Sequence, residues 1–162
     1  MIGIDEPAGQ RLLNLLRKKH LTLASAESCT GGMVSSFLTS ISGSSDVYSG
    51  GIVSYTNQVK NRILGVTEST LQKYGAVSEQ CAGEMAAGAA RQIQTEVAFS
   101  VTGIAGPGGG TKLKPVGTVC FGFFIKGKVI TETCRFTGDR NDIRQQSVQH
   151  VVERLLELVS AV

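Results

Sequence analysis

The sequence lacks the features that mark several large functional classes. Its four cysteines form no C-x-x-C pair, which excludes the usual zinc-site and redox patterns, and we predict neither a metal site nor a cofactor. No signal peptide opens the chain, and no apolar run reaches the roughly eighteen residues of a membrane span. The net charge of +3 is small and scattered, whereas nucleic-acid binding needs a dense basic surface. We therefore expect a cytoplasmic protein that binds neither nucleic acid nor membrane.

Glycine is abundant, but it forms no known nucleotide-binding motif. Residues 106–112 read Gly-Pro-Gly-Gly-Gly-Thr-Lys, and Thr111 stands where a P-loop needs a glycine before the lysine. The spacing G-x-G-x-x-G also fails, because Leu113 occupies its third glycine position. The common serine-hydrolase signatures are absent as well, since no G-x-S-x-G occurs and no serine has a lysine three residues later.

The remaining composition is that of a globular protein, and we treat residues 1–162 as a single domain. Segments with helical apolar spacing alternate with short, strand-like apolar runs. They predict, in order, a helix at 7–19, a strand at 21–25, a helix from 33 to about 40, a strand at 51–55, a short helix carrying Lys60, a helical turn after Thr67, a helix from 78 to about 94, strands at 97–101, 116–125 and 128–136, and a helix at 141–159. The order α-β-α-β-α-α-β-β-β-α predicts an α/β fold, a three-layer α/β/α sandwich with a mixed central sheet.

The most informative stretch is residues 26–32, Ala-Glu-Ser-Cys-Thr-Gly-Gly, between the first strand and the next helix. A serine in such a turn is a candidate nucleophile, and backbone N–H groups beside it could hold an oxyanion. We predict Ser28 as the nucleophile and the backbone of Thr30, Gly31 and Gly32 as the oxyanion site. The alternative is that Ser28 or Thr30 only caps the helix, with the glycines serving the turn geometry.

Three strand ends carry polar residues and are expected to meet at one edge of the sheet. If the strands ending at Ser28, near 55–60 and at 102–103 are parallel neighbours, their ends share the edge where ligands gather. The two histidines, at 20 and 150, lie elsewhere, so the candidate base is Lys60, whose pKa burial or nearby positive charge would lower. Lys60 could instead be a solvated helix residue. Cys29 is a rival nucleophile, but adjacent side chains in such a turn point apart.

Six segments of the sequence, taken in order, resemble the C-terminal domain of the CinA family. These segments are AESCTGG at 26–32, GIVSYTNQVK at 51–60, GAVS at 75–78, TGIAGP at 102–107, KPVGTV at 114–119 and GDR at 138–140. The resemblance extends from about residue 21 to the last helix. The resemblance is specific because six separate segments occur in the same order as in the family.

The resemblance implies a nicotinamide-nucleotide amidase that takes part in pyridine nucleotide recycling. Such an enzyme hydrolyses the carboxamide of nicotinamide mononucleotide to give nicotinic acid mononucleotide and ammonia. The resemblance also implies an α/β sandwich and a catalytic serine–lysine pair, which corresponds here to Ser28 and Lys60. Some family members carry a further N-terminal domain. With only about twenty residues before the predicted strand at 21–25, this chain resembles the stand-alone form, or a fragment that contains only this domain.

The remaining site predictions concern the substrate. Tyr55 could orient Lys60 or the pyridinium ring, or it could simply end its strand. A phosphate needs N–H donors or cations. We predict substrate contacts from Asn57, from Thr102 and Gly103 at the end of a strand, from Gly106 in the glycine-rich loop, and from Arg140. Arg140 and Arg144 could alternatively be helix-surface charges.

A competing hypothesis is a non-catalytic module that binds a nucleotide or a partner, in the competence or DNA-damage context for which the family was named. The presence of both Ser28 and Lys60 favours the enzyme, because binding alone requires neither. An amidase acting on another pyridine nucleotide or carboxamide would share the same chemistry. We also expect a homo-oligomer, dimeric or larger.

Overall fold

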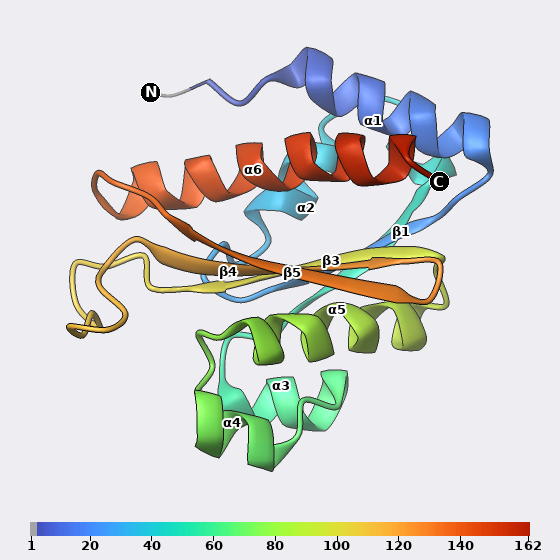
Figure 1. Ribbon diagram of the computed structural model, residues 1–162. Coiled ribbons are helices and arrows are strands. Elements are labelled where there is room, and N and C mark those ends of the chain that lie inside the picture. Colours follow the sequence, from blue (N-terminus) through green and yellow to red (C-terminus); the bar gives the residue numbers. More distant parts are fainter. Residues whose placement is uncertain (1–2) are drawn as a thin grey trace.

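The computed structural model describes residues 3–162 as a five-stranded mixed sheet between two layers of helices (Figure 1). The strands are β1 (Leu23–Glu27), β2 (Tyr48–Val53), β3 (Val97–Gly103), β4 (Thr118–Ile125) and β5 (Lys128–Arg135). The helices are α1 (Glu6–Lys19), α2 (Met33–Thr39), α3 (Asn57–Leu64), α4 (Glu68–Tyr74), α5 (Glu79–Ile93) and α6 (Arg140–Ser160), with a 3-10 turn η1 (Ser44–Asp46) before β2. The predicted α/β/α sandwich with a mixed sheet is confirmed.

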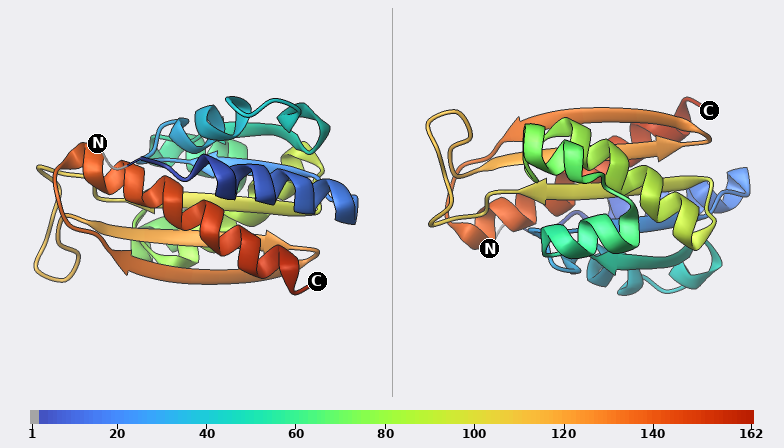
Figure 2. Two further views of the ribbon diagram at one scale, coloured as in Figure 1. Left: turned by 90° about the horizontal axis from the view of Figure 1, so that it is seen from above. Right: turned by 90° about the horizontal axis from the view of Figure 1, so that it is seen from below.

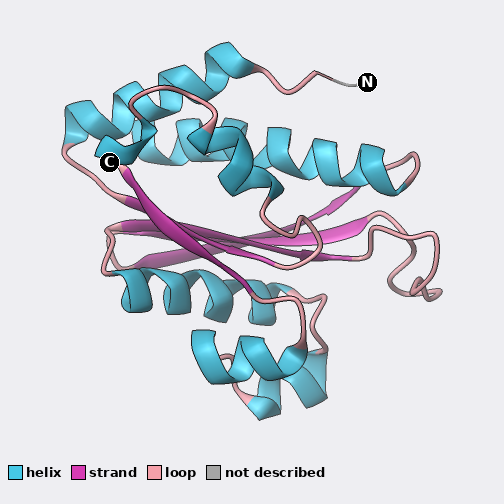
Figure 3. Ribbon diagram, turned by 180° about the vertical axis from the view of Figure 1, so that it is seen from behind, coloured by secondary structure: helices cyan, strands magenta, loops and turns pink. Residues whose placement is uncertain are grey.

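The strand order places three polar strand ends on one edge of the sheet. The order is β2-β1-β3-β4-β5, in which β1 pairs parallel with both β2 and β3. β4 is antiparallel to β3 and β5 is antiparallel to β4. Helices α1, α2 and α6 cover one face of the sheet and α3, α4 and α5 cover the other, as the view from behind in Figure 3 also shows. The carboxyl ends of β1, β2 and β3 therefore meet at one edge, as expected from the sequence.

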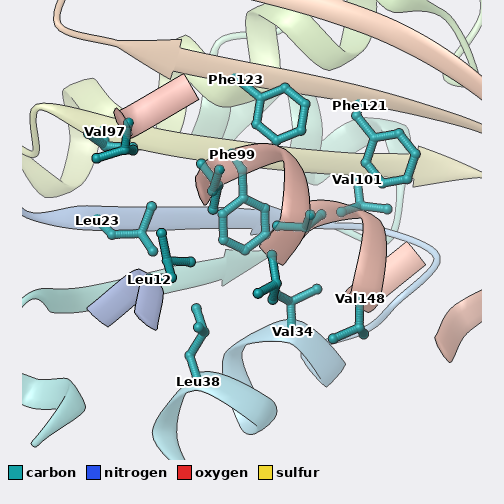
Figure 4. Packing of buried hydrophobic residues seen from close by; sticks show 14 of the residues in the cluster. Leu12, Leu23, Val34, Leu38, Val97, Phe99, Val101, Phe121, Phe123 and Val148 are labelled. Carbon is teal, nitrogen blue, oxygen red and sulfur yellow. The ribbon is translucent and has the colours of Figure 1, made fainter. Parts of the chain in front are cut away.

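The main hydrophobic core lies between the sheet and helices α1, α2 and α6 (Figure 4). Leu12 of α1, Leu38 of α2 and Val148 of α6 pack with Leu23 and Phe99 of the sheet, and all five are fully buried. The central strands β1 and β3 are buried almost throughout, which explains their short, unbroken apolar runs. Each large apolar side chain buried in this way contributes about 1.5–3 kcal/mol to stability.

A smaller core on the opposite face is built around α5, whose alanines and glycines let other elements approach closely. Gly88 of α5 lies against the end of α3, where a Cβ atom would overlap the carbonyl oxygen of Leu64. Arg91 of α5 donates a hydrogen bond of 3.0 Å to the same carbonyl group. These contacts hold α3 close to α5, and Lys60 on the inner side of α3 is buried as a result.

The bounds of all five strands differ from those predicted by up to three residues, and two of these differences affect the site. β1 begins and ends two residues later than the predicted 21–25, because its pairing with β3 continues to Glu27. Ser28 therefore follows the strand directly. β2 ends at Val53 instead of residue 55, because Ser54 and Tyr55 leave the sheet and their carbonyl groups accept hydrogen bonds from α3.

The helices also differ in detail from the prediction. Helix α6 begins at Arg140, one residue before the predicted start at 141, because Asp139 and Asp142 form a reciprocal capping box at that helix start. The helical turn predicted after Thr67 is a seven-residue helix, α4, so three helices rather than two separate β2 from β3. Residues 104–117 form a loop that projects beyond the sheet (Figure 2). Within residues 3–162, no helix is both long and apolar enough to cross a membrane.

Candidate active site

The turn after β1 holds Ser28 at the carboxyl edge of the sheet. The N–H of Ser28 donates to the carbonyl of Val101 on β3, at 2.9 Å, which ties the turn to the neighbouring strand. Gly31 and Gly32 follow with φ values of 56° and 101°, in the left-handed region that favours glycine. Ser28 is only 8% exposed, so its hydroxyl meets a small and defined set of neighbours.

Neither Ser28 nor Thr30 caps the following helix. The N-cap of α2 is Gly32, which has no side chain to accept a hydrogen bond. The Met33 N–H donates to the Thr30 carbonyl, and the next two N–H groups of the helix donate to the carboxylate of Glu27, from Val34 at 2.9 Å and from Ser35 at 3.1 Å. The capping alternative is therefore wrong, and the Ser28 hydroxyl is left for another partner.

That partner is Lys60, which α3 places beside Ser28. The start of α3 is capped by the Thr56 hydroxyl, which accepts from the Val59 N–H at 3.3 Å. Lys60 Nζ lies 3.0 Å from Ser28 Oγ, and Lys60 is only 2% exposed. The alternative of a solvated surface lysine is therefore wrong.

The surroundings of Lys60 favour the neutral amine. Burial lowers its pKa from the ordinary value of 10.5, and no carboxylate among the described residues forms an ion pair with it. Besides Ser28, Nζ contacts two carbonyl oxygens, those of Ser54 at 2.9 Å and Tyr55 at 3.3 Å. In a neutral amine the two hydrogens can serve these carbonyls, and the nitrogen lone pair is left to accept the Ser28 proton.

Cys29, the rival nucleophile, is in an unsuitable environment. Burial raises the pKa of the Cys29 thiol to about 12, an effect that the nearby charges of Arg144 and Lys60 only partly oppose. A thiol with such a pKa is protonated at neutral pH and is a weak nucleophile. Of the two adjacent side chains, only that of Ser28 combines access to a base with a reactive oxygen.

Ser28 and Lys60 line a cavity of about 220 Å³ at the carboxyl edge of the sheet. The other predicted site residues on its wall are Tyr55, Asn57, Thr102, Gly103 and Arg140. Thr30, Gly31, Gly32 and Gly106 do not line it. Seven of the eleven residues predicted from the sequence are therefore brought together around one small cavity.

Within residues 3–162, no three His, Cys, Asp or Glu side chains are grouped so that they could hold a metal ion.

Several of these residues shape the wall rather than offer free polar groups. The Thr102 hydroxyl donates to the carbonyl of Ala76 at 2.9 Å, which joins the end of β3 to the segment before α5. Gly103 lies so close to β4 that a Cβ atom would be 2.8 Å from the Thr118 carbonyl oxygen. Glycine is therefore required at 103 for the strands to pair up to the cavity.

Arg140 links two segments beside the cavity, one containing Gly106 and the other containing Tyr55. Its guanidinium donates to the Gly106 carbonyl at 2.7 Å and to the Tyr55 hydroxyl at 3.2 Å. A second cavity of about 660 Å³ shares Arg140 and Ala105 with the first, so the two adjoin at this side chain. In the part of the chain that the structure describes, no carboxylate pairs with Arg140, and its charge faces the two cavities unneutralised.

Three contributions to the site were not predicted from the sequence. The Ser54 carbonyl holds Lys60, Glu27 binds the start of α2, and Arg144 donates to the turn carbonyls of Cys29 and Thr30, each at 3.1 Å. Glu27 could have been noticed in the sequence, because it is the one charged residue of a short strand that is buried throughout. A main-chain carbonyl such as that of Ser54 offers none.

The comparisons with known proteins identify the family of this chain. Residues 5–159 match the CinA C-terminal domain family. The chain is 48% identical over 151 residues to a CinA-like protein of Thermotoga neapolitana, covering 93% of this chain and 37% of that protein. It is 49% identical over 145 residues to a CinA-like protein of Fusobacterium nucleatum, covering 90% and 35%. The chain thus spans roughly a third of the length of these relatives.

Solved structures show the same architecture. A CinA superfamily protein from Klebsiella pneumoniae matches with a TM-score of 0.94 at 32% identity, over 97% of this chain and 98% of that one. The competence/damage inducible protein CihA from Agrobacterium tumefaciens matches with a TM-score of 0.92 at 41% identity, over 96% of each chain. Sequence and fold therefore agree along nearly the whole length, and the chain belongs to the CinA C-terminal domain family.

Proposed function

We propose that this chain is an amidase that hydrolyses the carboxamide of nicotinamide mononucleotide, with Ser28 as nucleophile and Lys60 as general base. The observation that carries the proposal is the 3.0 Å contact between Lys60 Nζ and Ser28 Oγ inside a small cavity. A binding protein has no need to bury a lysine without a carboxylate partner, because the desolvation of the amine is costly. A serine hydrolase without a histidine base does need such a group.

In the acylation step, neutral Lys60 takes the Ser28 proton while Ser28 Oγ forms a bond to the carboxamide carbon. The π electrons of the carbonyl move to its oxygen, which becomes the oxyanion of a tetrahedral intermediate. When that intermediate collapses, the carbon–nitrogen bond breaks. Protonated Lys60 gives its proton to the departing nitrogen, so that ammonia leaves and an ester to Ser28 remains.

Deacylation uses the same two residues in the same roles. Neutral Lys60 removes a proton from a water molecule, whose oxygen attacks the ester carbon. Collapse of the second intermediate returns the proton to Ser28 Oγ and releases nicotinic acid mononucleotide. The carbonyl groups of Ser54 and Tyr55 keep the amine oriented through both steps, because they accept its hydrogens in either protonation state.

The two adjoining cavities support a substrate with a small planar end and a larger anionic end. The cavity of about 220 Å³ would take the carboxamide end beside Ser28, and the cavity of about 660 Å³ would take the ribose phosphate. Arg140 stands between them with no carboxylate partner within residues 3–162. A guanidinium in that position would bind a phosphate through charge-assisted hydrogen bonds.

The test is ammonia release from nicotinamide mononucleotide by the purified protein, with Ser28→Ala measured beside it. Ser36→Ala is the matched control, because Ser36 is exposed on α2 and lies outside the cavity. We expect release by the wild type and by Ser36→Ala, and none by Ser28→Ala. Retention of the nucleotide without consumption would refute the amidase and favour the non-catalytic binding module.

A further inference from the structure

We propose that Arg144 is a positioning residue of the active site, which orients and polarises the backbone N–H of Cys29 as an oxyanion donor. Arg144 lies on α6, in the opposite helical layer from Lys60. Its Nε donates to the carbonyl of Cys29 and its Nη2 donates to the carbonyl of Thr30, both at 3.1 Å. The inference rests on the proposed function, because an oxyanion forms only if Ser28 attacks a carbonyl group.

The route from Arg144 to the cavity consists of two peptide units in series. The Thr30 carbonyl that accepts from Arg144 belongs to the same peptide unit as the N–H of Gly31. That N–H donates to the carbonyl of Ser28, at 3.0 Å. The Ser28 carbonyl in turn shares its peptide unit with the N–H of Cys29, and Cys29 lines the cavity beside Ser28 Oγ.

The Cys29 N–H, at the end of this route, donates to no other residue within 3–162. It faces only the thiol of its own side chain, and a thiol sulfur is a weak acceptor. The N–H groups of Gly31 and Met33 are used within the turn, and those of Val34 and Ser35 are used by Glu27. Thr30 and Gly32 also have N–H groups without an acceptor within residues 3–162, but neither residue lines the cavity. The N–H of Cys29, one residue after the nucleophile, is therefore the group in this turn best placed to meet an oxygen bonded to the attacked carbon.

Arginine suits this position for geometric and electrostatic reasons. Its planar guanidinium donates through two nitrogens at once, which matches the carbonyls of two successive residues. Within residues 3–162, no carboxylate pairs with Arg144, so its charge acts on the turn. A cation on the first carbonyl strengthens each hydrogen bond that follows, because bonds in series polarise one another by about 10–30% each.

The experiment compares Arg144→Ala and Arg144→Lys with Arg154→Ala. Arg154 is a matched control on the same helix, partly buried and bound to Glu132 and Glu157 instead of to the turn. Two rates are measured for each variant. One is hydrolysis of nicotinamide mononucleotide as a function of pH, and the other is covalent modification of Ser28 by a fluorophosphonate, followed by mass spectrometry. The fluorophosphonate needs the nucleophile and the oxyanion site but not the substrate pocket.

A donor that contacts the oxyanion directly contributes about 10²–10³-fold to kcat. Arg144 acts only through the backbone N–H of Cys29, so we expect Arg144→Ala to lower kcat by less, about tenfold. KM should stay nearly constant, because the interaction strengthens only in the transition state. The fluorophosphonate rate should fall in parallel, Arg144→Lys should restore part of both rates, and the pH midpoint should not move. Arg154→Ala should keep both rates, whatever its effect on the melting temperature.

The inference is overturned if Arg144→Ala keeps its kcat, if Arg154→Ala loses as much, or if the pH midpoint shifts while the plateau rate does not. That last result would mean that Arg144 acts on Lys60 through its charge. If the wild type reacts with the fluorophosphonate but does not hydrolyse the nucleotide, the proposed substrate fails. The labelling rates of the variants then still decide the role of Arg144. A wild type that does neither overturns both proposals.

Discussion

Replacement of Lys60 by arginine tests whether the site needs a neutral amine or only a positive charge. Burial lowers the pKa of Lys60 below 10.5, and within residues 3–162 no carboxylate opposes this shift. Arginine keeps the charge but is not deprotonated in proteins, so it cannot accept the Ser28 proton. A general base contributes about 10²–10⁴-fold to the rate, which corresponds to about 2.7–5.4 kcal/mol of barrier. We expect Lys60→Arg to lose that much in kcat.

The pH dependence of the wild type follows from the same geometry. Protonated Lys60 cannot act as a base, so kcat/KM should rise with pH and become constant above the pKa of Lys60 in the free enzyme. Because burial lowers this pKa, the midpoint of the rise should lie below 10.5. Each pH unit below the midpoint should slow the reaction about tenfold, since one pKa unit is worth about 1.36 kcal/mol.

The assay is ammonia release from nicotinamide mononucleotide over a pH series, with circular dichroism to confirm folding at each pH. Lys128→Arg is the matched control, because it makes the same chemical change at an exposed position on β5. The control should reproduce the wild-type profile. If Lys60→Arg kept more than about a tenth of kcat, or the same rising limb, the general base would have to be another group.

Three further predictions concern single substitutions. Arg140→Ala should raise KM for nicotinamide mononucleotide by more than it lowers kcat, since hydrogen bonds to charged groups contribute about 1.5–3 kcal/mol; it should hardly affect hydrolysis of nicotinamide riboside, which lacks the phosphate. Cys29→Ala should keep the amidase activity, because a thiol with a pKa of about 12 is protonated at neutral pH, and a large loss of kcat would restore Cys29 as a candidate nucleophile. Gly88→Ala should destabilise the protein by about 1–3 kcal/mol, because its Cβ would overlap the Leu64 carbonyl, and should also reduce kcat by displacing Lys60; urea denaturation that showed unchanged or higher stability would contradict this packing.

The secondary structure was accessible from the sequence because it depends on local rules. Short apolar runs predicted β1 and β3, and each was placed within two residues of its observed bounds. The convergence of three strand ends could be inferred from the residues that follow each strand. Only the parallel order of the strands had to be assumed, and the pairing of β1 with β2 and β3 confirmed it. The error at the end of β2 has a tertiary cause, because Ser54 and Tyr55 leave the sheet to bind Lys60.

The environment of Lys60 could not be inferred from the sequence. A lysine in a short polar helix reads as solvent-exposed, and the residues adjacent to it do not indicate otherwise. Its burial depends on α3 packing closely on α5, where Gly88 accommodates the Leu64 carbonyl. The burial that lowers the pKa of Lys60, and the absence of a carboxylate partner within residues 3–162 that would oppose this shift, are likewise properties of the assembled layers.

Residue types and their order along the chain were enough to establish an α/β fold, a serine in a glycine-rich turn, and a lysine after the next strand. Tertiary structure alone decided that the amine of Lys60 faces Ser28 and that the guanidinium of Arg144 holds the turn. Those contacts join residues 32 and 115 positions apart, from helices on opposite faces of the sheet. Their distances depend on how the helical layers pack on the sheet, and that packing sums many weak contacts that no local stretch of sequence records.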